Sequence, residues 1–175
     1  MGAALFLAGL AVAPPARAAD TPTTVPVVLA VELSADHRER VLAAIREWND
    51  ALNGSVRFEI EANGARAGVW TVIPVPKSEL RNGPESLALT FAFPAGGGVV
   101  CLYLDRLGGR DITGVMLHEF GHVLGLTHDG GGQLMSTRYS WHDMKCIDHG
   151  TMLQVAAHYK LRIDELKWCG PPAAH

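Results

Sequence analysis

The sequence has no run of basic residues. Acidic residues number 18 and basic residues 15, which gives a formal net charge of −3 with both signs mixed along the chain. Proteins that bind nucleic acid usually present a basic patch to the phosphate backbone. We therefore expect no nucleic-acid partner.

The sequence also lacks an apolar run at its start that is long enough to cross a bilayer. The apolar stretch at residues 3–13 is too short for a membrane span, and Ala16-Arg17-Ala18 after it has the small-x-small form of a signal-peptidase site. No Lys or Arg precedes the apolar stretch, and the alternative is a buried N-terminal helix, against which Pro14-Pro15 argues. We interpret residues 1–19 as a signal peptide and residues 20–175 as one secreted or periplasmic domain without a stable membrane anchor.

Cysteine is scarce, with three residues in the chain. An odd number allows at most one internal disulfide and leaves one thiol. In an exported chain, a disulfide between Cys146 and Cys169 would pin the C-terminus, while pairings that involve Cys101 stay open. Because Cys101 lies in an apolar segment, we expect it to be a small buried hydrophobe.

Histidine, by contrast, is abundant. Three of the eight histidines fall in the stretch HEFGHVLGLTH at residues 118–128. His118 and His122 are four residues apart, so on a helix their Cβ atoms stack about 5–6 Å apart. Gly125 can adopt the left-handed conformation that ends a helix, which would return His128 to the same point. Because three protein nitrogens plus a water are typical of a catalytic zinc, the sequence predicts one Zn²⁺ ion on these histidines.

Glu119 follows the first of these histidines. A carboxylate at this position is placed to take a proton from a metal-bound water and pass it to a leaving amine. The alternative is a histidine-rich helix end without chemical consequence. Five specified positions arise by chance on the order of 10⁻⁴ times in such a chain, which disfavours that alternative.

The stretch resembles the H-E-x-x-H-x-x-G-x-x-H signature of the metzincin zinc proteases. Met135 follows His128 after a short glycine-rich segment, where this family has the methionine of its Met-turn, although a lone methionine is often core filler. The resemblance implies an α+β domain with three αβα-like layers. It also implies a twisted, mostly parallel sheet of about five strands with an antiparallel edge strand, two long helices behind it and a C-terminal helix.

The apolar patterns along the chain agree with this order of elements. Near-continuous or alternating apolar runs predict strands, and apolar residues at helical spacing predict helices. The expected strands are residues 27–33, 56–61, 69–75, 87–93 and 99–104, and the expected helices are residues 35–52, a metal helix that starts at Asp111, and residues 148–161.

Residues 87–96 resemble the L-A-x-x-F-P-x-G segment that precedes the metal helix in matrixins, a metzincin branch. Since the family binds substrate as a strand added to this edge, the resemblance implies main-chain substrate contacts at Leu89, Thr90, Phe91, Ala92 and Phe93. The alternative is an ordinary sheet strand. The His and Asp residues that hold a second zinc and calcium in matrixins have no match here, so we expect no second zinc. Asp105 and Asp111 could hold calcium, but a solvated loop is the favoured interpretation. We also expect no pro-segment.

Two further residues lie near the motif. Asp129 directly follows the third histidine, and we expect it to support a ligand or bond nearby backbone. Tyr139 lies four residues after Met135, whereas some metzincins have a zinc-approaching tyrosine two residues after that methionine. Because the offset differs, we disfavour Tyr139 as a zinc ligand or oxyanion donor and expect it at most to support the site.

These observations predict a secreted zinc endopeptidase (EC 3.4.24 type) that resembles small matrixin-like bacterial-type peptidases and acts on protein or peptide substrates as a monomer. One alternative is a zinc hydrolase with a non-protein substrate. Another is a non-catalytic zinc-stabilised binding module, against which the presence of Glu119 argues.

Overall fold

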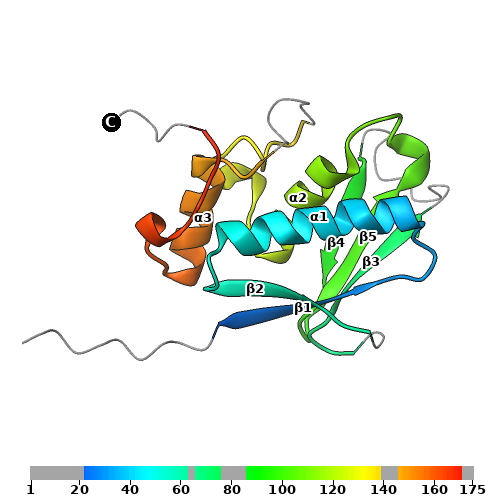
Figure 1. Cartoon of the computed structure of the whole chain (residues 1–175), viewed down its shortest axis with the longest axis horizontal. Helices are drawn as coiled ribbons and strands as arrows, with labels where there is room; N and C mark the ends of the chain where they lie inside the picture. Colours follow the sequence, from blue (N-terminus) through cyan, green and yellow to red (C-terminus); the bar gives the residue numbers. More distant parts are fainter. Residues whose placement is uncertain (1–21, 63–65, 76–85, 139–145, 171–175) are drawn as a thin grey trace, which may run out of the picture.

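The computed structural model describes residues 22–62, 66–75, 86–138 and 146–170, so the expected signal peptide lies outside the described residues. Five strands form one sheet in the order β2-β1-β3-β5-β4 (Figure 1). Neighbouring strands are parallel except β4, which pairs antiparallel with β5 at the edge. The predicted mostly parallel sheet with an antiparallel edge strand is therefore confirmed. The strands are β1 (Thr23–Leu29), β2 (Val56–Ile60), β3 (Trp70–Val75), β4 (Ala88–Ala92) and β5 (Gly98–Tyr103).

Three α-helices complete the fold. They are α1 (Ala35–Ala51), α2 (Ile112–Val123) and α3 (His149–Tyr159), and the 3₁₀ turns are η1 (Leu104–Arg106), η2 (His128–Gly130) and η3 (Ile163–Glu165). Each α-helix begins at a side chain that accepts a hydrogen bond from a backbone N–H group of its first turn, namely Ser34, Asp111 and Asp148. Within the described residues, we find no helix whose length and apolarity would let it span a membrane.

The core lies between one face of the sheet and helices α1 and α2. Trp48 of α1 is fully buried, and its indole N–H group donates to the Leu117 carbonyl of α2 over 3.0 Å. The rings of Phe58 in β2 and Phe120 in α2 lie 5.0 Å apart. These contacts hold α2 across the sheet, with β4 alongside it (Figure 1).

The first strand differs from the prediction. It covers Thr23–Leu29 in place of residues 27–33, and its alternate residues are only half-buried. Pairing between β1 and β3 begins only at Val27, so the side of β1 that faces β3 is still unpaired at Pro26. Proline lacks a backbone N–H group, and at this unpaired position its absence removes no hydrogen bond of the sheet. At the other end, the chain turns after Leu29, because Leu33 N donates to Ala30 O and Ser34 then caps α1. The other strands and helices lie within two residues of their expected bounds.

Candidate metal centre and catalytic site

Helix α2 brings the first two histidines and Glu119 into the core. Its N-terminus is capped by the Asp111 carboxylate, which accepts from Thr113 N over 3.1 Å and lies 3.8 Å from Arg40. Asp111, where the sequence placed the start of the metal helix, thus caps that helix. His118 and Glu119 are only 8% and 6% exposed, so these polar side chains need partners within the protein.

The end of α2 turns the chain back toward the site. Leu126 N donates to Gly121 O over 3.0 Å and Gly125 N to His122 O over 2.9 Å, which is the hydrogen-bond pattern of a Schellman motif. Gly125 has φ +82°, the left-handed conformation expected from the sequence. The reversal places His128 beside the two helical histidines.

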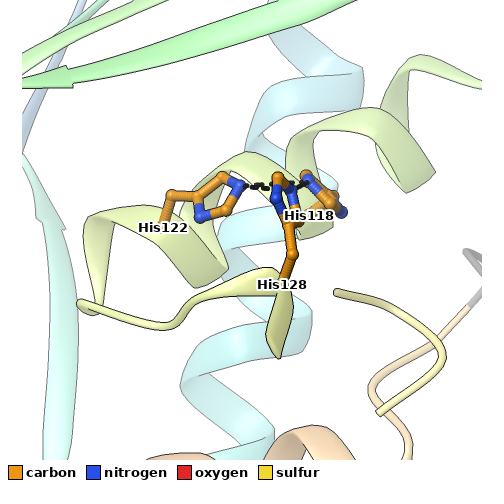
Figure 2. A group of neighbouring side chains, drawn as sticks. All are labelled: His118, His122 and His128. Atoms are coloured by element: carbon orange, nitrogen blue, oxygen red, sulfur yellow. Dashed lines mark hydrogen bonds between the residues drawn. The ribbon is translucent and has the colours of Figure 1, made fainter. Parts of the chain in front are cut away.

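The three Nε2 atoms converge on one point (Figure 2). The Nε2–Nε2 distances are 3.1 Å for His118–His122, 3.1 Å for His122–His128 and 3.2 Å for His118–His128. Three tetrahedral ligands at the usual zinc–nitrogen distance stand roughly 3.3–3.4 Å apart. The spacing therefore fits a zinc ion. Within the described residues, these histidines are the one His/Cys/Asp/Glu group that could hold a metal ion.

The other ring nitrogens show why a cation suits this cluster. Nδ1 of His118 lies 2.7 Å from Leu134 O, and Nδ1 of His122 lies 2.9 Å from Leu126 O. A carbonyl oxygen can only accept, so each Nδ1 carries a hydrogen, and Nε2 is the ring nitrogen left to bind a metal ion. Burial is the main reason that the pKa of His118 is lowered to about 4, and the imidazoles of His122 and His128 act in the same direction. The cluster thus presents three converging Nε2 atoms, two of them on rings that are oriented by carbonyl oxygens, which suits a metal ion.

Glu119 is the buried carboxylate of the site. Burial raises its pKa to about 7, and a hydrogen bond from Thr90 opposes that rise. The Thr90 hydroxyl donates to Glu119 Oε2 over 2.6 Å. A carboxylate in this environment can exchange a proton near neutral pH.

Met135 lies fully buried beside α2. A Cβ atom added to Gly121 would lie 2.4 Å from the Met135 sulfur, so the Met135 side chain in its present position relies on a glycine in the middle of the histidine motif and would have to shift for any larger residue. Gly121 occupies a position that the histidine motif leaves unspecified. Its role depends on a contact with a residue fourteen positions later, which local spacing does not reveal.

Asp148 is a second residue whose role was not anticipated. Its Oδ1 atom caps α3 through Thr151 N at 3.1 Å, and its Oδ2 atom accepts from Leu134 N at 2.9 Å. Because Leu134 O in turn accepts from His118 Nδ1, the Leu134 residue links Asp148 to the first histidine. The helix-start pattern predicted the position of Asp148 but gave no signal for this second contact.

A disulfide joins the segments on either side of α3. Cys146 and Cys169 are bonded, with their Cα atoms 6.1 Å apart. Cys169 N donates to Ile147 O over 2.9 Å, which brings the C-terminal segment alongside Asp148. Cys101 is a buried free cysteine, and burial raises the pKa of its thiol.

A cavity of about 400 Å³ opens over the histidines and Glu119. Of the five expected substrate contacts, Leu89, Thr90 and Ala92 line this cavity, whereas Phe91 and Phe93 are 42% and 52% exposed and are not part of its wall. Asp129 lies in η2, and its side chain is outside what the structure describes. Tyr139 also lies outside the described residues.

The structure of this chain, unlike its sequence, resembles known proteins. No protein-family model and no curated protein match the sequence. The structure is similar to high choriolytic enzyme 1, a hatching-enzyme zinc protease from Oryzias latipes (medaka fish). The TM-score is 0.53 at 12% identity, over 84% of this chain and 94% of that one. A weaker likeness, with a TM-score of 0.42 at 18% identity, covers 67% of this chain and 57% of myroilysin. This chain therefore shares its α+β fold with the hatching-enzyme zinc protease.

Proposed function

We propose that the chain is a zinc-dependent endopeptidase of the metzincin type, close to the small matrixin-like enzymes. The observation that carries the proposal is the convergence of three Nε2 atoms within 3.2 Å, with two of the Nδ1 atoms engaged by carbonyl oxygens. The adjacent Glu119 carboxylate and the open cavity support a catalytic over a structural role for the ion. The fold shared with a zinc protease supports the same class of reaction.

The residues have distinct roles in this proposal. His118, His122 and His128 would hold a zinc ion, which supplies Lewis-acid polarisation of the scissile carbonyl and an activated water. Glu119 accepts a proton from the attacking water and donates it to the leaving amine. Strand β4 pairs with β5 alone among the described strands, which supports its use as the edge where a peptide adds as a further strand. Met135 forms an apolar floor beside the histidine helix.

We further propose that the chain is exported and acts on protein or peptide as a monomer. The disulfide between Cys146 and Cys169 supports an oxidising compartment, since such bonds are rare in the cytosol.

The test combines metal analysis with cleavage of a casein-type substrate. The parent chain is expected to contain one zinc per molecule and to lose cleavage in the presence of a chelator. Glu119→Ala should keep its zinc and lose cleavage by at least about 10³-fold. A Glu119→Ala variant that digests casein at the parental rate would contradict the proposal. A zinc-loaded parent that cuts no member of a peptide library would point instead to a non-protein substrate.

A further inference from the structure

Thr90 contacts the catalytic carboxylate from the edge strand. Its Oγ1 atom lies 2.6 Å from Glu119 Oε2 and 3.4 Å from the Glu119 carbonyl oxygen. A hydroxyl group has one hydrogen to donate, and the shorter distance assigns it to the carboxylate. A separation of this length is typical of a charge-assisted O–H···O⁻ bond.

Glu119 has few other means of keeping its orientation. Its side chain is 6% exposed, so water gives it little support. Among the described residues, Thr90 makes the one hydrogen bond to this carboxylate. A buried carboxylate that must act on a bound reactant loses efficiency when its orientation is not held, because proton transfer requires hydrogen-bond reach.

The sheet register fixes the Thr90 hydroxyl in place. Thr90 pairs with Val100 of β5, and Ala88, Thr90 and Ala92 alternate along β4 with Leu89 and Phe91. Since successive side chains of a strand point to opposite faces, Thr90 shares the α2 side of β4 with the buried Ala88. The hydroxyl is therefore anchored by the same strand that offers its main chain to a substrate.

We propose that Thr90 is a positioning residue for Glu119, an inference that rests on the proposed function. Its hydroxyl holds Oε2 and leaves Oε1 as the proton-exchanging oxygen. Oε1 takes a proton as the water oxygen bonds to the carbonyl carbon. It returns that proton to the amine nitrogen as the carbon–nitrogen bond breaks. The Thr90 hydrogen stays on Oγ1 throughout, so the hydroxyl orients the base without being consumed.

The first experiment compares substitutions at Thr90 in the zinc-loaded full chain. Thr90→Val keeps the branched shape but removes the donor, and it should lower kcat roughly 10–100-fold with KM within about twofold and zinc content at the parental level. Thr90→Ser keeps the donor and should recover kcat to within about threefold of the parent. Thr71→Val, on another strand of the sheet, is the matched control and should cleave at the parental rate. Parental kcat in Thr90→Val, or a Thr90→Ser variant as slow as Thr90→Val, overturns the proposal.

The second experiment asks whether Thr90 acts through Glu119. In a Glu119→Ala background, Thr90→Val should cause no further loss, whereas independent roles would multiply the two losses and overturn the proposal. Thr90→Ala, which adds no second methyl group, should match the kcat of Thr90→Val and guards against a packing artefact. If Glu119→Ala cleaves at the parental rate, the proposed function itself fails. If Glu119→Ala is inactive and Thr90→Val is unchanged, only the role of Thr90 fails.

Discussion

His118 and His122 lie one turn apart on α2, yet their imidazoles are supported by different kinds of structure. The Nδ1 atom of His122 is held by Leu126 O, four residues ahead and within the turn that ends the helix. The Nδ1 atom of His118 is held by Leu134 O, sixteen residues ahead. The N–H group of Leu134 is held in turn by Asp148, next to a disulfide-bonded segment. One ligand is thus oriented by local backbone and the other by long-range packing.

This difference implies that the two ligands can be disturbed separately. Damage to the segment that contains Leu134, Asp148 and the disulfide should reach the proposed zinc site through His118. Damage to the turn at Gly125 should reach it through His122 and His128.

The largest effect is expected when the disulfide is removed. Cys146→Ser combined with Cys169→Ser frees a loop closed over a sequence separation of 23 residues, and the expected loss is about 3 kcal/mol in the free energy of unfolding. Denaturant unfolding of the oxidised parent, the reduced parent and the double variant measures it. Identical unfolding midpoints for all three proteins would mean that this disulfide does not stabilise the folded structure.

Asp148→Ala should come next. It removes the cap of α3 at a cost of about 1–2 kcal/mol, and it should weaken zinc binding roughly 10–100-fold because Leu134 is no longer held against His118. Ser34→Ala is the matched control, since it removes the cap of α1. The control should lose similar stability and keep parental zinc affinity in a competition titration with a chelator. Equal zinc affinities in the two variants would show that Asp148 does not support His118 through Leu134.

Gly125→Ala tests the local turn that supports His122 and His128. A side chain at φ +82° costs about 1–2 kcal/mol, and the new Cβ atom would also lie 3.0 Å from the His158 ring. Gly54→Ala is the control, because Gly54 has φ +83° with nothing within 4 Å of an added Cβ atom. Both variants should melt at lower temperature, but only Gly125→Ala should lose zinc affinity. A Gly54→Ala variant with the same zinc loss would show that general destabilisation is responsible.

The smallest effect concerns acid. Backbone N–H groups and the Thr151 hydroxyl lower the pKa of Asp148 below 3.8, against the opposing effect of burial. A lowered folded-state pKa adds stability above the unfolded pKa, and this stability is lost as pH falls through the folded value. The difference in unfolding free energy between the parent and Asp148→Asn should therefore shrink below about pH 4. Chemical denaturation from pH 3 to 7 measures it, and a difference that grows on acidification would contradict the assignment.

Local patterns in the sequence determined much of the fold. Apolar periodicity located four of the five described strands and the helices, and Asp111 and Asp148 marked two of the helix starts, because each of these signals acts over a few neighbouring residues. The start of β1 was predicted wrongly, because Pro26 fits within a strand only where the neighbouring strand β3 does not pair with it. Spacing within residues 118–128 likewise determined the histidine cluster, because a helix and a glycine turn set its geometry.

Only the tertiary structure decided what surrounds that cluster. The contact of Thr90 with Glu119 depends on β4 lying beside α2. The approach of Met135 to Gly121 depends on the path of the chain after His128. The link from Asp148 to His118 depends on the position of α3. These contacts join residues 14 to 30 positions apart. No local propensity specifies such pairs, because they form only when the sheet order and the packed core bring the segments together.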